Sequence, residues 1–150
     1  MKKSRKIIKR IACCLLAVAI VLNLIWNSIT CLNVDPACDY ITSHALEESH
    51  GRAAWHVLGA LNAGGKDMIL VPAAYKYYLY ISDFDYVEDY THYVPEKGDI
   101  VVFPMTWKHP LGHIAIWNGK HWVSDYKQKS IYIDEDYKGV KYIVYRNVFK

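Results

Sequence analysis

The chain has 150 residues, of which 53% are hydrophobic and 14% aromatic, and its formal net charge is +3. This length suits one domain with one core, and the composition excludes disordered and collagen-like chains. Six of the 18 basic residues stand at positions 2–10 with no acid among them, so the remainder has 12 basic residues against 15 acids, a formal −3. A mildly acidic remainder argues against a nucleic-acid binder.

The basic block is followed by an apolar run, IACCLLAVAIVLNLIW, at residues 11–26. About 20 apolar residues span a bilayer, and this run reaches that length when its more polar end is included. We predict a cytoplasmic basic segment at 1–10 and an uncleaved transmembrane signal anchor at 11–30, with the rest of the chain across the membrane. A cleaved signal peptide is the alternative, although residues 26–30 offer no small-residue cleavage site.

The four cysteines divide along the same boundary. Cys13 and Cys14 lie inside the apolar run, whereas Cys31 and Cys38 follow it. A compartment outside the cytoplasm permits disulfides, so Cys31 and Cys38 are a candidate bridge. Two free thiols are the alternative.

The remaining sequence predicts helices first and strands afterwards. After a linker at 31–39, helical patterns occur at 40–48, 53–63 and 72–83, with Ser49 as a candidate cap and Gly64-Gly65 as a helix stop. Residues 84–97 are predicted to be a loop. Alternating Ile-, Val-, Tyr- and Trp-rich segments then predict strands at 99–103, 113–117, 122–126 and 142–146, and a short one at 131–133. This order predicts an α+β fold, with N-terminal helices packed on an antiparallel sheet.

His113 opens one predicted strand, directly after Gly112, where an imidazole can reach the rim of the sheet. The Asn118-Gly119 pair predicts a hairpin back along this strand. A two-residue turn would pair His113 with Ser124, and a three-residue turn would pair it with Asp125. Chemistry favours Asp125, since a carboxylate can fix the tautomer of an imidazole.

A histidine base needs a nucleophile, and the start of the helix at 53–63 is the place to look for one. A helix N-terminus stabilises a thiolate and offers free N–H groups to an oxyanion. The residue at that place is Ala53.

Four segments together resemble one family. SHGRAAWHVLGALNAGG, PEKGDIVVF, HPLGHIAIWNG and HWVSDYKQ, in this order over residues 40–146, are similar to the nucleophile helix, the P-x-x-G-D strand, the G-H strand and the W-V-S-D-[FY]-x-Q strand of papain-like peptidoglycan amidases of the NlpC and CHAP group. The resemblance implies an amide hydrolase acting on the peptide stem of peptidoglycan. Together with the predicted anchor, this gives an expected location at the bacterial inner membrane, with the domain periplasmic or otherwise extracytoplasmic. It implies a Cys nucleophile at position 53, His113 as base and Asp125 as orienting residue.

Ala53 departs from that family pattern, because the family has Cys there. One explanation is an engineered Cys-to-Ala change that makes the enzyme inactive. The other is a natural pseudoenzyme that binds cell wall or a partner protein. A membrane-tethered phage-type lysin is a further alternative for the function. We favour the engineered form, since the other motif positions are intact.

Ser124 and His109 are secondary candidates for the site. His109 and His113 are separated by a proline and a glycine, and so do not share a helical face. A zinc site needs three or four convergent ligands. The sequence therefore predicts no metal, and it implies no organic cofactor.

Overall fold

The computed structural model describes residues 12–21, 32–81, 84–87 and 90–147, and the chain divides into two compact units, Met1–Cys31 and Leu32–Lys150. In the first unit residues 12–21 are helical. Within the described residues, no helix combines the length and the apolar character needed to cross a membrane. The predicted anchor at 11–30 extends outside those residues at both ends, and it stays a prediction.

The second unit begins with two helices, α2 (Val34–Ser43) and α3 (Ala53–Ala63). The bounds of α3 match the prediction, and Gly64 is its C-cap. In contrast, α2 begins six residues before the predicted helix and occupies much of the predicted linker at 31–39. The reason is packing, because Ala37, Cys38 and Ile41 form a buried face on α2.

Gly59 brings the two helices close together. A Cβ at this position would lie 2.5 to 2.7 Å from atoms of the Tyr40 ring, so the missing side chain lets Tyr40 pack directly on α3. The third predicted helix is a shorter 3₁₀ helix, η1 (Ala74–Leu79). Its two buried residues, Ala74 and Tyr77, are three apart, which is the spacing that aligns side chains in a 3₁₀ helix.

A five-stranded sheet follows, with the order β1-β5-β2-β3-β4 and antiparallel pairing throughout. Its strands are β1 (Asp85–Tyr86), β2 (Ile100–Phe103), β3 (His113–Trp117), β4 (Trp122–Val123) and β5 (Ile143–Arg146). β1 lies in the predicted loop at 84–97, where a two-residue strand leaves no visible alternation. The predicted strand at 131–133 does not form, and β4 is shorter than predicted.

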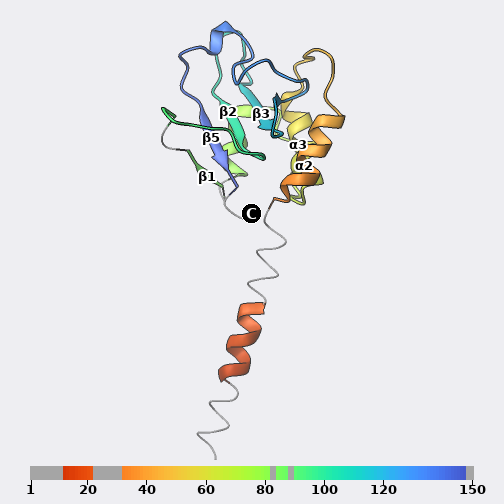
Figure 1. Ribbon diagram of the computed structural model, residues 1–150, viewed down its shortest axis with the longest axis vertical. Helices are drawn as coiled ribbons and strands as arrows, with labels where there is room; N and C mark the ends of the chain where they lie inside the picture. The colour runs from red at the N-terminus through yellow and green to blue at the C-terminus, as the bar shows by residue number, and fades with distance from the viewer. Residues whose placement is uncertain (1–11, 22–31, 82–83, 88–89, 148–150) are drawn as a thin grey trace, which may run out of the picture. The chain divides into compact units, whose positions relative to one another are not determined.

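The helices cover one face of the sheet, and Figure 1 shows α2 and α3 next to each other on the side of β3. Ile114 and Ile116 of β3 belong to the core between helices and sheet. Ala115 faces a second, aromatic cluster that includes Phe103 and Tyr137. The alternation predicted for this strand is therefore confirmed, and His113 shares the face of Ala115.

Gly112 sets the backbone just before His113. Its φ is +67°, and a Cβ there would lie 2.6 Å from the carbonyl oxygen of Phe103. We expect Gly112→Ala to lower the free energy of unfolding by about 2 to 4 kcal/mol, because left-handed strain and a backbone clash add. Urea unfolding would measure this. Gly139→Ala is the matched control, since Gly139 has φ +80° with nothing within 4 Å of its Cβ position. Equal losses in the two variants would contradict the clash.

Candidate active site

Ala53 is the first residue of α3, as predicted from the sequence. The helix is capped without a side chain: Arg52 is the N-cap, and its carbonyl accepts hydrogen bonds from the N–H groups of Trp55 and His56. The first N–H groups of a helix have no intrahelical partner, so the start of α3 presents donors and the positive end of the helix dipole. The side chain of Ala53 is half-buried and contributes no reactive group.

His113 is buried at the start of β3, opposite Phe103 of β2. Its ring lies 6.4 Å, between centroids, from the rings of both Phe103 and Tyr137. Burial lowers the pKa of His113 to about 4, although the charge of Asp125 acts in the opposite direction. The imidazole is therefore neutral at pH 7, the form that can accept a proton.

Gln128 holds His113, a role that was not predicted from the sequence. Its Nε2 lies 2.6 Å from Nε2 of His113 and 3.1 Å from Oγ of Ser124, and all three residues are buried. Gln128 is the last position of the HWVSDYKQ segment, so the signal is present in the motif. Strand pairing, from which the prediction was made, indicates only the residues directly opposite the histidine, and Gln128 lies beyond the end of β4.

Asp125 holds the loop before α3 and is not hydrogen-bonded to His113. Its buried carboxylate accepts from the backbone N–H groups of His50 (2.8 Å) and Arg52 (3.0 Å), and from the hydroxyls of Ser49 and Ser124. Burial raises the pKa of Asp125, but the hydrogen bonds from Arg52, His50 and Ser124 outweigh it and leave the pKa below its usual value. The predicted direct contact between Asp125 and His113 is thus corrected to a role as anchor of this loop. Ser49, predicted as a helix cap, is not the N-cap of α3; its hydroxyl donates to Asp125 instead.

The turn after β3 explains this correction. Trp117 pairs with Trp122, so the connection holds four residues, and both predicted turn lengths are wrong. Asn118 closes the loop through its own side chain, because its Oδ1 accepts from the N–H groups of Lys120 and His121. The longer turn shifts the register past both Ser124 and Asp125.

Ser124 completes a chain of buried polar groups. It contacts both Gln128 and Asp125 through Oγ, and Asp125 in turn binds the backbone of Arg52. A continuous network therefore runs from the imidazole of His113 to the residue before Ala53. His113 lies on the sheet face opposite the α3 contact, so this link is made at the end of the strand.

His109 points into a different cluster. Its Nε2 lies 2.6 Å from Oδ2 of Asp134, and its ring stacks on Tyr137. Ligand atoms of His109, Asp134 and Asp136 lie within 4.8 Å of one another, but Lys108 already pairs with Asp136. Both carboxylates thus have protein partners, and His109 is not part of the network around His113.

Two further positions that the sequence analysis singled out, Asp99 and Cys38, are buried and make contacts that hold the fold together. Asp99 is buried and accepts from Tyr93, from the N–H of Glu96 and from Arg146, which ties the start of β2 to β5. Cys38 is a buried free thiol with its Sγ 3.7 Å from the carbonyl oxygen of Trp117, so it is not in a disulfide here. Its candidate partner, Cys31, lies outside the described residues.

The buried histidine makes stability depend on pH. The pKa of His113 is 6.5 in the unfolded chain and about 4 in the folded chain. The stability that comes from keeping His113 neutral is therefore fully present above pH 6.5, and it is lost as the pH falls towards 4. We expect the free energy of unfolding to fall by up to about 3 kcal/mol across this window. In His113→Gln, urea unfolding at pH 7, 6, 5 and 4 should show a clearly smaller fall. An unchanged slope would contradict the assignment.

The fold is of the peptidoglycan-amidase type, as its match to two solved structures shows. The structure of the native type VI effector-immunity complex Tae3-Tai3 from Ralstonia pickettii matches with a TM-score of 0.69 and 31% identity, over 76% of this chain and 98% of that chain. The selenomethionine structure of the same complex matches with a TM-score of 0.66 and 31% identity, over 73% and 98%. The chain therefore belongs to the Tae3 effector family. No family model matches the chain and no curated protein matches it, so the narrower resemblance to the NlpC and CHAP group has no support of that kind.

Proposed function

We propose that this chain has the active-site framework of a cysteine amidase or endopeptidase that cleaves amide bonds in the peptide stem of peptidoglycan, and that it is inactive because Ala53 stands at the nucleophile position. Membership of the Tae3 family supports the amidase class. The observation that carries the proposal is the intact buried network from His113 to the start of α3, ending beside a residue without a reactive group.

With cysteine at position 53, the reaction would proceed by acyl transfer. His113 takes the thiol proton, and the thiolate attacks the amide carbonyl to form a tetrahedral oxyanion, which the N–H at position 53 stabilises. The C–N bond then breaks, the amine leaves with the proton from His113, and water hydrolyses the thioester. Alanine supplies no atom that can form the bond to carbon.

Gln128 would decide which nitrogen of His113 acts as the base. If the amide N–H donates to Nε2, the imidazole proton lies on Nδ1. If the amide is turned so that Oε1 accepts from Nε2–H, Nδ1 becomes the basic nitrogen. General base catalysis by Nδ1 needs the second arrangement, in which the amide N–H of Gln128 no longer donates to Ser124, and we assign Gln128 this positioning role.

Digestion of purified peptidoglycan tests the proposed reaction. The Ala53→Cys form should release new peptide fragments that mass spectrometry identifies, and the Ala53 form should release none. If the Cys form leaves the wall intact, the amidase assignment fails. The codon for residue 53 in the natural gene decides whether Ala53 is engineered.

A non-catalytic binder of cell wall or of a protein partner is the second candidate. Ala53 itself favours it, since the surrounding network is preserved without the nucleophile. The matched Tae3 is described as one component of an effector-immunity complex, which supports a protein partner for this chain as well.

Membrane tethering is the remaining part of the proposal. The basic block at 2–10 and the apolar run at 11–26 support an anchor at 11–30 with the domain outside the cytoplasm. A periplasm-dependent reporter fused after Lys150 should be active in bacterial cells. A reporter active only in the cytoplasm would overturn this topology.

A further inference from the structure

A pocket of about 590 Å³ lies beside the start of α3. It is lined by residues of α2 and its C-cap, and by the N-cap and first turn of α3. None of the lining residues is acidic. They are Tyr40, His44, Arg52, Trp55 and His56. Two aromatic side chains, two imidazoles and one guanidinium therefore share one opening. Such a lining suits a ligand that is both partly apolar and negatively charged.

The pocket borders the nucleophile position. His56 follows Ala53 by three residues on the same helix, and side chains at this spacing have Cβ atoms about 5 to 6 Å apart. Arg52 directly precedes Ala53. Two lining residues of the pocket are thus neighbours of position 53, one along the chain and one on the helix surface.

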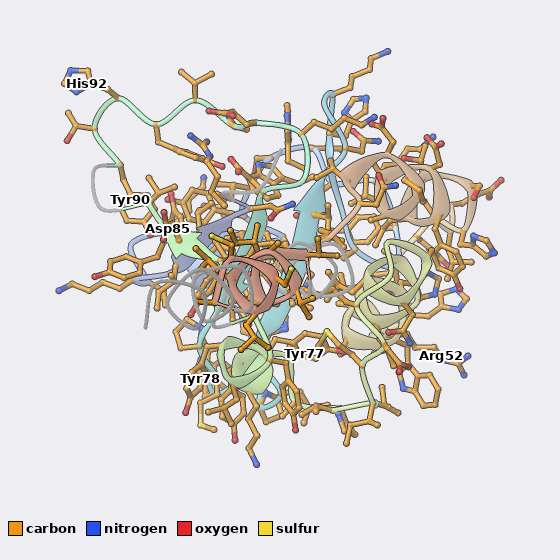
Figure 2. All side chains as sticks on the ribbon, turned by 90° about the horizontal axis from the view of Figure 1, so that it is seen from below. Arg52, Tyr77, Tyr78, Asp85, Tyr90 and His92 are labelled. Atoms are coloured by element: carbon orange, nitrogen blue, oxygen red, sulfur yellow. The ribbon has the colours of Figure 1, made fainter. Side chains whose placement is uncertain are left out.

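The backbone of Arg52 is fixed by a hydrogen bond, whereas its charged side chain is exposed to solvent. Its N–H donates to the buried carboxylate of Asp125, while its side chain is exposed and lines the pocket. In Figure 2 it lies at the outer edge of the molecule, on the side of the helices. Arg146, by contrast, pairs with Glu96 and Asp99; across the described residues no ion pair engages the guanidinium of Arg52.

The histidine and the tryptophan of α3 complete the recognition surface. Nδ1 of His56 is buried and has no hydrogen-bond partner in the described parts of the chain. The side chain of Trp55 is 58% exposed, although it is a large apolar group, and it can cover the aliphatic part of a peptide.

We infer that this pocket binds a free carboxylate of the peptide substrate, with Arg52 as its main partner and Trp55 against the adjoining aliphatic chain. This inference takes the identity of the ligand, a stem peptide, from the proposed function, but it does not require that the chain be catalytically active. Arginine forms paired, charge-assisted hydrogen bonds with carboxylates, which lysine or glutamine cannot reproduce. Peptide stems offer such groups, because some of their residues are joined through one carboxyl and keep another free.

Binding to the inert Ala53 form tests the inference without turnover. The probe is a synthetic stem tetrapeptide, L-Ala-γ-D-Glu-diaminopimelyl-D-Ala, compared with the same peptide carrying amides in place of its free carboxylates. Isothermal titration should show tighter binding of the carboxylate form. Arg52→Gln keeps the backbone N–H that Asp125 binds, and should raise Kd for that form about tenfold with little effect on the amidated form. Lys129→Gln, an exposed position outside the pocket, is the matched control for loss of one positive charge.

Each outcome decides the inference. Equal Kd values for the two peptides, equal effects of Arg52→Gln and Lys129→Gln, or no binding of either peptide would overturn it. A thermal unfolding midpoint of Arg52→Gln equal to that of the parent shows that a loss of binding is local. If the Ala53→Cys form fails to cleave peptidoglycan while Arg52-dependent binding persists, the proposed reaction is wrong and the carboxylate site stands.

Discussion

Replacing His113 by alanine in the Ala53→Cys form is expected to lower kcat/KM by about three orders of magnitude or more. The imidazole serves twice, because it takes the thiol proton before attack and protonates the leaving amine afterwards. His113→Ala removes both proton transfers at once. Release of peptides from purified peptidoglycan, measured at several substrate concentrations, would give kcat/KM for the two forms.

Two histidine-to-alanine controls separate the role of the base from general damage. His121 lies in the turn at 118–121, where its backbone rather than its side chain closes the loop. His109 is paired with Asp134, outside the buried network. We expect each control to change kcat/KM by less than about tenfold. Near-full activity of the His113→Ala form would refute the papain-like mechanism for this chain, even if Ala53→Cys restored cleavage.

Gln128→Leu in the Ala53→Cys form separates positioning from catalysis. The leucine preserves volume but cannot fix a tautomer, so kcat should fall with little change in KM. The pH at which activity rises should also move, because the partner of Nε2 is lost. A purely structural role for Gln128 would reduce stability without moving the pH profile.

The sequence predicted the elements with strong periodicity and failed where packing or turn geometry decides. The bounds of α3 and β3 follow from local pattern. Buried positions recur at helical spacing in α3, and successive side chains of β3 face two different clusters. The early start of α2 depends on a face formed by Ala37, Cys38 and Ile41, and this face is meaningful only once α3 lies against it. β1 has two residues, too few to show a period.

The site was predicted in part for the same physical reason. Motif positions placed Ala53 at a helix start and His113 at a strand start, and both are local features. Which side chain meets the imidazole depends on the number of residues in one turn, and Asn118 stabilises four rather than two or three. The four-residue turn moves Asp125 out of register with His113, and Gln128, which lies beyond the end of β4, reaches the imidazole with its side chain instead.

The revised role of Asp125 gives the second large effect. We expect Asp125→Ala to lower the free energy of unfolding by about 3 to 5 kcal/mol, because it leaves the backbone N–H groups of His50 and Arg52 and the buried hydroxyl of Ser124 without their acceptor. Ser49→Ala is the matched control, since it removes one hydroxyl from the same carboxylate and leaves both backbone bonds. Its cost should be about 1 kcal/mol.

Urea unfolding at several pH values distinguishes an anchor from an orienting residue. The pKa of Asp125 is below its usual value, so its contribution to stability is present above the unfolded pKa near 3.8 and is lost only as the pH falls further. Asp125→Ala should therefore lower stability by a similar amount at pH 7 and pH 5, well above that window. If Asp125 instead oriented His113, its loss would leave stability nearly unchanged at pH 7 and reduce kcat in the Ala53→Cys form. A small loss of stability joined to a large loss of kcat would return Asp125 to the role that the hairpin register first suggested.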